Sequence, residues 1–472
     1  MSWAGGIRME KTKVFIGNTI KLVVIGVICA ALLIFRFGLD EYEKRYGSAG
    51  NLDAGAFFSA IVDGTLKGDW SAIEESLTDD DRYKIAINHA YKNAKGLVSY
   101  SATPAQEFSY EIINNKYIKI TQYQGVREQV EIPAMIENKP VCLIGENAFA
   151  ENIYLKSVKL PDTVVEICAG AFRNCKSLTH VELSCNLNTI GEVAFFECVK
   201  LKEIGLEEDS ALHAIGNSAF EACSSLEKVY FHNSIYDDVH LGSAVFKNCT
   251  ALKSVELPDN LLEVGAYAFE ECDALTSITL KDAKVVGQGA FLSCDGLKKL
   301  ILSKNVERID NQCFLECVAL QTIVIGEKIN YIGEGAFMNC TSLEVVTIEE
   351  RYLTADEEGA AIGADAFHNT KLKELVVPSQ FLYVGDRAVA ECKSLKTFKW
   401  HNSRRNVSQQ CLANHVFDGC KSSLTIYLPQ TVSEIGDWDL ENMGKLVVYA
   451  ADGSYARQVA KEREVKSMDW DQ

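Results

Sequence analysis

The chain has 472 residues and a formal net charge of -18 at pH 7. This excess of carboxylates argues against nucleic acid or an anionic lipid surface as the main partner, because like charges repel and no basic stripe is present. Hydrophobic residues make up 47% of the chain and only 7 residues are prolines, which excludes a long disordered linker.

An apolar segment lies near the N-terminus. Residues 14–35 are apolar at all but three positions, and a helix of that length, at about 1.5 Å per residue, could cross a hydrocarbon core of about 30 Å. We expect a transmembrane signal-anchor helix at residues 14–37. Basic side chains precede it, which predicts a cytoplasmic N-terminus at 1–13 and an extracytoplasmic remainder. The alternative is a cleaved signal peptide and a secreted protein.

Residues 38–105 have a different composition and no repeat. Three weak helical faces predict a small helical, membrane-proximal spacer. The acidic run at 79–81 is more typical of a solvated helix start than of a calcium loop, because no further ligand spacing accompanies it. We therefore expect no metal site in the spacer.

A repeat begins after the spacer and continues almost to the C-terminus. The block I-G-x-x-A-F at 144–149 returns, with Val for Ile in two copies, at 190, 215, 264, 286, 332 and 362. Alignment on its aromatic residue gives thirteen turns, most often 23 residues apart. Self-similarity at this period predicts a solenoid, a class of protein that usually binds other molecules rather than catalysing reactions.

A second phrase, C-x-x-L-x-x-V-x-L, follows each block. This phrase predicts a β-strand, because Val181 and Leu183 alternate with outward residues, and Leu178 begins the strand from the core side. The Gly of the block suggests either a corner with positive φ or close packing. The small Ala before the aromatic residue would let the next turn lie close. One unit buries nothing alone, but stacked units share a continuous core.

This consensus resembles the BspA-like leucine-rich-repeat family. The resemblance covers about residues 108–469, and it includes a first turn at 117–149 and a terminal cap at 447–469 with a helix and a short closing strand. It implies a mainly β solenoid of the leucine-rich-repeat type with about 13 turns, here at 106–446, and a capping segment at 447–472. The predicted transmembrane helix and small helical spacer precede this solenoid. Family members occur on the surface of bacteria and some parasitic protists, and the resemblance implies adhesion to other proteins.

Sixteen cysteines invite a disulfide framework in an exported chain. Ten of them lie three residues after the aromatic position, at 175, 198, 223, 249, 272, 294, 317, 340, 392 and 420. Equivalent atoms in neighbouring turns are about 4.8 Å apart, which is within disulfide reach. Parallel side chains point the same way, however, so we favour a ladder of buried free thiols.

The sequence contains no catalytic motif. It lacks G-x-S-x-G, H-E-x-x-H, G-x-x-x-x-G-K-[ST] and G-x-G-x-x-G, and its eight histidines fall at unrelated repeat positions. A Cys–His pair brought together by folding remains the alternative. We expect no catalytic residue, no cofactor, no metal ion and no small-molecule substrate.

The outward side of the L-x-x-V-x-L strand displays two side chains per turn. Early turns are polar there, whereas the seventh to tenth turns form an apolar and β-branched stripe. Such a stripe indicates a contact surface, although β-propensity alone also explains the residue types. The candidate partner-binding residues are Tyr230, Ile301, Val324, Val345, Thr347 and Val376.

Four insertions follow Leu206, Phe231, Ile348 and Trp400, each between the end of the strand and the next corner. They should therefore lie at one edge of the solenoid, and insertions on one side often mark the binding side. The third insertion contains an acidic run at 356–358, and the fourth contains a basic pair at 404–405.

These observations favour a non-catalytic, membrane-anchored cell-surface protein that mediates protein–protein binding or adhesion. The partner would be a protein of a host, of a neighbouring cell or of the same cell, and the membrane would be contacted through the N-terminal helix. One alternative is a membrane-tethered scaffold or sensor for a partner of the same cell. A remote alternative is an enzyme with a site between the spacer and the repeats.

Overall fold

The computed structural model describes residues 102–206, 211–231, 239–352, 358–402, 410–439 and 445–470. The chain divides into two compact units, 1–92 and 93–472, and all described residues belong to the second. The predicted transmembrane helix at 14–37 and nearly all of the predicted spacer at 38–105 lie outside the described residues. The predicted domain boundaries at 106 and 446 stay predictions.

The predicted localisation is corrected. Within the described ranges, no helix is both long and apolar enough to cross a membrane. The α-helix found there, α5 (Tyr455–Glu462), has 8 residues, and a helix of that length rises only about 12 Å against a hydrocarbon core of about 30 Å. The assignment of a single-pass protein with a cytoplasmic N-terminus and extracytoplasmic repeats is therefore withdrawn.

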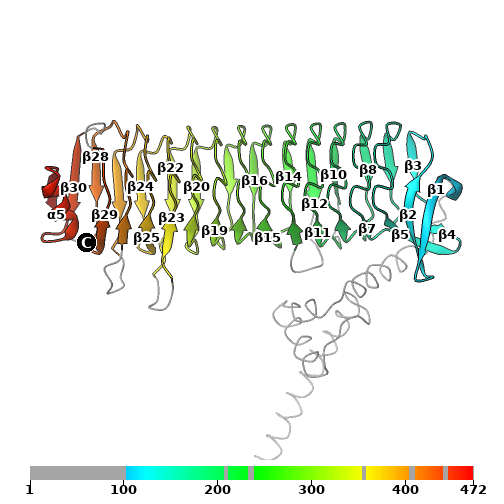
Figure 1. The fold of residues 1–472 in the computed structure, drawn as a ribbon, viewed down its shortest axis with the longest axis horizontal. Helices are drawn as coiled ribbons and strands as arrows, with labels where there is room; N and C mark the ends of the chain where they lie inside the picture. Colours follow the sequence, from blue (N-terminus) through cyan, green and yellow to red (C-terminus); the bar gives the residue numbers. More distant parts are fainter. Residues whose placement is uncertain are drawn as a thin grey trace, which may run out of the picture. The chain divides into compact units, whose positions relative to one another are not determined.

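Each turn of the array contributes one strand to a long, mostly parallel sheet (Figure 1). Thr189 and Ile190, for example, lie opposite Ala214 and Ile215 of the next turn. The sheet has 16 strands: β1 (Phe108–Ile113), β2 (Tyr117–Tyr123), β4 (Met135–Ile136), β5 (Lys139–Ile144), β7 (Glu166–Ile167), β9 (Thr189–Ile190), β11 (Ala214–Ile215), β13 (Val239–Leu241), β15 (Leu261–Val264), β17 (Val285–Val286), β19 (Arg308–Ile309), β21 (Tyr331–Ile332), β23 (Ala360–Ile362), β25 (Phe381–Val384), β27 (Gln410–Leu412) and β29 (Val432–Ile435).

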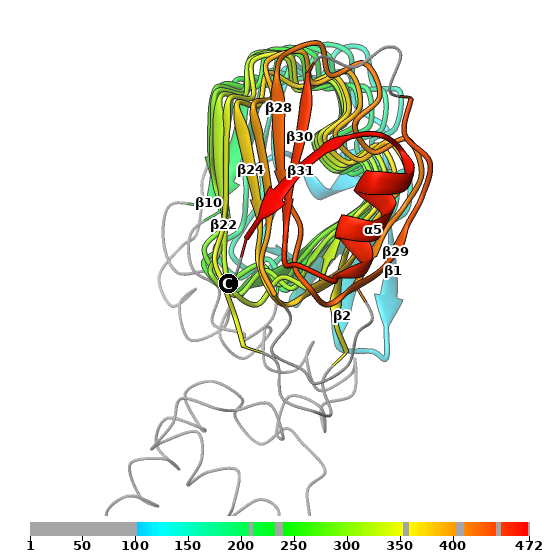
Figure 2. The same ribbon diagram turned by 90° about the vertical axis from the view of Figure 1, so that its left-hand side faces the viewer.

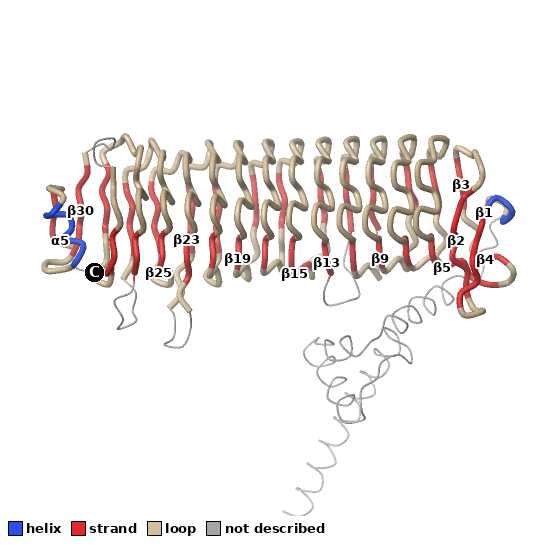
Figure 3. The backbone as a smooth tube through the Cα atoms, viewed as in Figure 1, coloured by secondary structure: helices blue, strands red, loops and turns tan. Residues whose placement is uncertain are grey.

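The second strand of each turn lies on the opposite side of the cross-section from this sheet (Figure 2). We call the side that carries these second strands the front face. Turns and loops join the two sets of strands (Figure 3). Four parallel sheets make up the front face: β3 (Gln129–Glu131), β6 (Ser157–Lys159) and β8 (His180–Glu182); β10 (Glu203–Leu206), β12 (Lys228–Phe231) and β14 (Ser254–Glu256); β16 (Ser277–Thr279), β18 (Lys299–Ile301), β20 (Thr322–Ile325) and β22 (Val345–Ile348); β24 (Glu374–Val377), β26 (Thr397–Trp400), β28 (Leu424–Tyr427), β30 (Leu446–Ala450) and β31 (Lys466–Asp469).

The solenoid has about 14 turns rather than the predicted 13. The additional turn contains β2, which pairs in parallel with β5. It lacks the I-G-x-x-A-F block, so alignment on the block missed it. Tyr123 takes the aromatic position in this turn: its ring stacks on Phe149 with 5.1 Å between centroids.

The core is a ladder of aromatic rings. Ten phenylalanines, from Phe149 to Phe367, are stacked with centroid separations between 4.8 and 5.5 Å. Each is at most 2% exposed. The spacing follows from the strands, because neighbouring strands lie about 4.8 Å apart and place identical side chains at ring-stacking distance. The repeated Phe therefore forms one continuous hydrophobic core.

The cysteines form a second ladder beside the rings. The thiol of Cys175 donates to the carbonyl oxygen of Phe149 in the preceding turn at 3.1 Å, and the same contact recurs for Cys198, Cys223, Cys249, Cys272, Cys294, Cys317, Cys340, Cys392 and, to Val389, Cys420. All cysteines in the described part of the chain are free, as the thiol-ladder prediction requires. Burial raises the pKa of Cys294 to about 12, which keeps the thiol protonated.

The Gly of the block serves close packing rather than a positive φ. A Cβ on Gly191 would lie 2.7 Å from the backbone nitrogen of Ala169 in the preceding turn. The left-handed residue comes two positions later, where Val193 has φ 49° and Gly335 has φ 59°. Of the two explanations offered by the sequence, close packing is the correct one at this position.

Both ends of the array are closed. At the N-terminal end, β1 pairs antiparallel with β2, preceded by the 3-10 helix η1 (Ala105–Glu107). At the C-terminal end, α5 buries Ala456, Val459 and Ala460, and β31 pairs in parallel with β30. The side chain of Ser454 caps α5 by accepting a hydrogen bond from the backbone of Arg457. The helix and closing strand implied by the resemblance are therefore present.

Candidate partner-binding face

The front face displays two columns of outward side chains that run along the array. Within a sheet the parallel register places equivalent positions of successive turns side by side. The inner column reads Glu131, Lys159, Glu182, Gly205, Tyr230, Glu256, Thr279, Ile301, Val324, Thr347, Val376, Lys399, Tyr427, Tyr449 and Met468. The outer column consists of the residues two positions earlier on each strand, such as His180, Ser277 and Val345. The residue between the two outward positions of a strand points inward, as the prediction of alternating side chains requires.

The predicted apolar stripe is centred on β18, β20 and β22. Ile301 is 43% exposed, Val324 is 56% exposed and Val345 is 49% exposed. Val324 lies opposite Thr347 in the ladder between β20 and β22, and Val345 lies opposite Thr322. Four of the six candidate residues are therefore exposed on neighbouring strands of one sheet. We call Ile301, Val324, Val345 and Thr347 the stripe.

The other two candidates lie in other sheets, although Val376 is on the front-face strand of the turn that directly follows the stripe. Val376 is half-buried on β24, and β22 and β24 belong to different sheets. Tyr230 lies on β12 in a third sheet. Its ring covers Gly205, where a Cβ would come within 2.6 Å of ring carbons, and the Lys228 ammonium lies 4.3 Å from the ring centre. The structure thus does not bring Tyr230 to the stripe.

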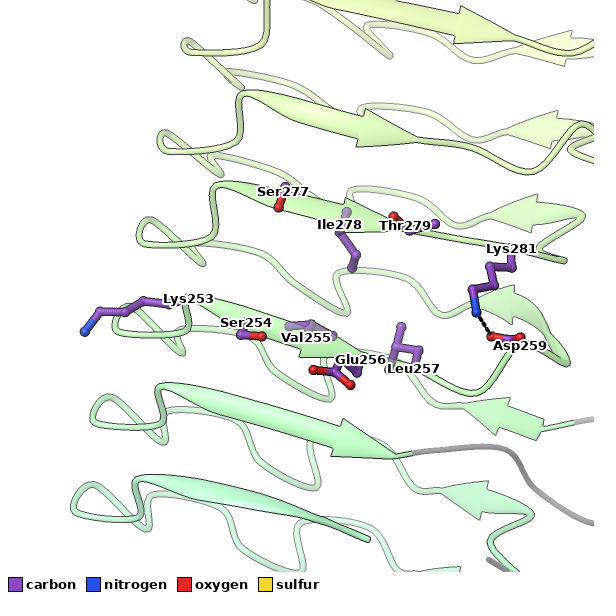
Figure 4. A pocket seen from close by; sticks show the side chains of 10 residues that line it. All are labelled: Lys253, Ser254, Val255, Glu256, Leu257, Asp259, Ser277, Ile278, Thr279 and Lys281. Atoms are coloured by element: carbon purple, nitrogen blue, oxygen red, sulfur yellow. Dashed lines mark ion pairs between the residues drawn. The ribbon is translucent and has the colours of Figure 1, made fainter. Parts of the chain in front are cut away.

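Two hollows open where one front-face sheet ends and the next begins. The hollow between β8 and β10 has a volume of about 340 Å³ and is lined by His180, Glu182, Gly205 and Tyr230, among others. The hollow between β14 and β16 has a volume of about 380 Å³ (Figure 4). Its rim carries the Lys281–Asp259 ion pair, with 2.5 Å between nitrogen and oxygen. Both hollows are open, and the one between β14 and β16 is the more polar.

The N-terminal half of the front face is charged and internally paired. Lys159 and Glu182 form an ion pair at 2.5 Å across neighbouring strands. Lys253 and Glu227 form another at 2.8 Å. The partners in these two pairs neutralise one another at the surface. The described residues contain no group of three or more His, Cys, Asp or Glu that could hold a metal ion.

Aromatic residues that the sequence interpretation missed lie at the C-terminal end of the front face. Tyr427 and Tyr449 continue the inner column beyond Lys399. Their rings stack with 4.8 Å between centroids, and Trp470 meets Tyr427 edge-on at 5.2 Å. The interpretation stopped at Lys399 because the repeat phrase degenerates after Trp400. The segments T-I-Y-L-P at 425–429 and V-V-Y-A at 447–450 keep the strand alternation and could have revealed both tyrosines.

The four predicted insertions fall largely outside the described residues, which omit 207–210, 232–238, 353–357 and 403–409. The acidic run at 356–358, except for Glu358, and the basic pair at 404–405 therefore lie outside the described residues and stay predictions. Described residues next to the last two insertions do meet: Nδ1 of His401 lies 3.3 Å from Oε2 of Glu350. The bases of these two insertions are thus neighbours.

The sequence model of the BspA type leucine rich repeat region matches residues 137–238, 239–359 and 351–450. A leucine-rich repeat protein of T. pallidum is 28% identical over 47% of this chain and 91% of its own, with a TM-score of 0.36. One from Bacteroides ovatus is 20% identical, covering 79% of this chain and 100% of its own, with a TM-score of 0.44. The pneumococcal vaccine antigen PcpA is 18% identical, covering 79% and 99%, with a TM-score of 0.39.

A comparison with curated proteins gives no match. The family model, in contrast, covers well over half of the chain, and its matched ranges coincide with the stacked turns described above. The protein therefore belongs to the BspA-type leucine-rich-repeat family.

Proposed function

We propose that this protein is a non-catalytic binding protein that holds a protein partner against the stripe on its front face. The observation that carries the proposal is the exposure of Ile301, Val324 and Val345, at 43%, 56% and 49%, on three neighbouring strands. Contiguous exposed aliphatic side chains are disfavoured in water and typically mark a contact surface. The three strands belong to one parallel sheet, which places these side chains next to one another.

The β-propensity of Val, Ile and Thr explains the stripe less well than a role in partner contact does. Ser254, Ser277 and Thr279 occupy equivalent outward positions on β14 and β16, in strands of the same kind. These strands form with hydroxyl side chains, so the fold does not require aliphatic residues at the outward positions. The change from hydroxyl to aliphatic side chains along the column supports selection for contact rather than for folding.

The stripe can supply a useful share of binding energy. Covering a half-exposed Val or Ile removes apolar surface from water and contributes about 1 kcal/mol per side chain. Three such contacts, with polar rim residues such as Thr347, correspond to the apolar centre and polar rim of protein–protein interfaces. The resemblance to the family favours adhesion, with the partner on another cell. A scaffold for a partner of the same cell uses the same surface.

The experiment compares partner capture by full-length protein and by two triple variants. The stripe variant carries Ile301→Glu, Val324→Glu and Val345→Glu. The control carries Ser254→Glu, Ser277→Glu and Thr279→Glu, which adds the same charge to the same face. Each bait is presented separately to proteins of its own cell and of neighbouring cells.

We expect one or more proteins to be retained by the wild type and by the control but lost from the stripe variant. The source of the retained protein then distinguishes adhesion from scaffolding. Equal capture by all three baits would exclude the stripe as the binding surface.

A further inference from the structure

The C-terminal end of the front face carries a second, chemically different surface. Tyr427, Tyr449 and Trp470 are in ring contact there, and the Lys399 ammonium lies 5.9 Å from the ring centre of Trp470. We call these four residues the aromatic platform. They come from β26, β28, β30 and the residue after β31, so the capping strand completes the platform.

The fold does not use these rings as core. The interior of the same strands is filled by Ile426 and Val448, both 0% exposed. Tyr427, Tyr449 and Trp470 are only half-buried, although every Phe of the internal ladder is fully enclosed. Half-exposed Tyr and Trp combine an apolar ring with a polar group that reaches water, which suits contact with an amphipathic ligand.

The charge around the platform is opposite to that of the whole chain. The outward positions of β26, β28, β30 and β31 include Lys399 and Lys466 but no carboxylate. The exposed carboxylate of Asp469, next to Trp470, lies 3.6 Å from the guanidinium of Arg457. Among the described residues, neither lysine forms an ion pair, whereas Lys159 and Lys253 at the other end of the face are paired. In a chain of net charge -18, a locally cationic aromatic surface favours a ligand with sparse negative charge.

We propose that the aromatic platform binds an acidic saccharide. The C–H face of a sugar ring packs on the aromatic side chains, its hydroxyl groups exchange hydrogen bonds with the tyrosine hydroxyls, and its carboxylate lies beside Lys399. Binding sites for small ligands combine aromatic lining with a few polar groups in this way. The site is separate from the stripe and does not depend on the protein-binding proposal.

Nucleic acid is the less favoured ligand, although rings interleaved with lysines also bind single strands. A polynucleotide carries one phosphate per residue, and the net charge of the protein repels such a dense line of charge. A uronic or sialic acid saccharide carries fewer charges and exposes more C–H surface per charge. An aliphatic peptide would leave the Lys399 ammonium without a counter-ion.

The experiment titrates the full-length protein with defined sugars and follows binding by calorimetry and tryptophan fluorescence, to which Trp470 contributes. The acidic probes are a hyaluronan hexasaccharide, a galacturonate oligosaccharide and sialyllactose. Chitohexaose is the neutral counterpart of hyaluronan, and a uridine hexanucleotide tests the nucleic-acid alternative. The variants are Tyr449→Ala and Lys399→Gln, and Lys228→Gln is a matched control at the other end of the face.

We expect at least one acidic sugar to bind and chitohexaose to bind about tenfold more weakly, the value of one charge-assisted hydrogen bond. Lys399→Gln should remove that difference, Tyr449→Ala should weaken both sugars, and Lys228→Gln should change neither. Thermal melting confirms that each variant is folded. The proposal is overturned if no acidic probe binds at millimolar concentration, if both platform variants bind like wild type, or if the hexanucleotide binds most tightly.

Discussion

The two halves of the front face share one backbone but present different chemistry. In the N-terminal half, Lys159 and Glu182 pair across neighbouring strands. In the C-terminal half, Val324 and Val345 are exposed on neighbouring strands, and Tyr427 and Tyr449 lie further along the face. Behind the Lys159–Glu182 pair and behind the stripe lie the same stacked Phe rings and the same thiol-to-carbonyl contacts. The interior therefore fixes the fold, and the outward side chains are free to determine what each half binds.

The comparison predicts that equivalent core residues of the two halves matter equally. Phe195→Ala and Phe337→Ala each remove a ring that is 0% exposed and stacked on both sides. Each should lower the free energy of unfolding by about 3–5 kcal/mol, because a large buried side chain is replaced by a cavity. Urea titration followed by circular dichroism measures both. A clear difference between the two variants would show that the halves do not share one core.

Substitutions at the left-handed position of the repeat should change the free energy of unfolding by less, and with opposite signs in the two halves. Val193 has φ 49°, and Gly335 has φ 59° at the equivalent place. Val193→Gly should stabilise the protein by about 1 kcal/mol, because a β-branched residue is strained in this conformation. Gly335→Ala should destabilise it by about 1 kcal/mol for the same reason. The midpoint of urea unfolding reports both changes, and shifts of the same sign would refute the strain argument.

The surface ion pairs of the N-terminal half should contribute little to stability. Lys159→Ala removes the contact with Glu182, and both side chains are about half exposed. We expect a loss of at most about 0.5 kcal/mol, because exposed pairs are screened by water and salt. Thermal melting at low and high salt checks this. A loss that persists in high salt would mean that the pair also packs the sheet.

The smallest effect should come from reductant. The described cysteines are free thiols, and burial raises the pKa of Cys175 and Cys294 to about 12. Reductant should leave the melting temperature unchanged, and a thiol reagent should react slowly with the native protein at pH 8 because almost no thiolate is present. The unfolded protein should react rapidly. A large fall in melting temperature on reduction would reveal disulfides.

Much of the fold follows from the sequence because the repeat leaves few choices. Three positions recur in the repeat. The repeated Phe forms the core ladder, the repeated Cys forms the thiol ladder, and the repeated Gly allows the close approach at Gly191. The prediction of thirteen turns was one short, because Tyr123 replaces Phe in a turn without the consensus block. Where a position varies, as at Val193, the sequence alone does not show that a left-handed conformation is required.

The candidate site was only partly predictable for a related reason. Strand alternation placed Ile301, Val324, Val345 and Thr347 correctly on the outside. It could not show that the front face divides into four sheets, so that Tyr230 and Val376 belong to other sheets than the stripe. That division depends on the backbone register between turns. The aromatic platform also combines residues from the last repeats and the cap, where the consensus no longer guides alignment.

The most direct test of the account is site-specific photo-crosslinking. A photoreactive amino acid is placed at Val324 in one protein and at Thr279 in another, so that both probes project from the same column of the front face. After exposure to the partner-containing fraction, the account predicts a discrete cross-linked protein adduct at Val324 and none at Thr279. Equal adducts at the two positions, or an adduct at Thr279 alone, would contradict the claim that the stripe is the binding surface.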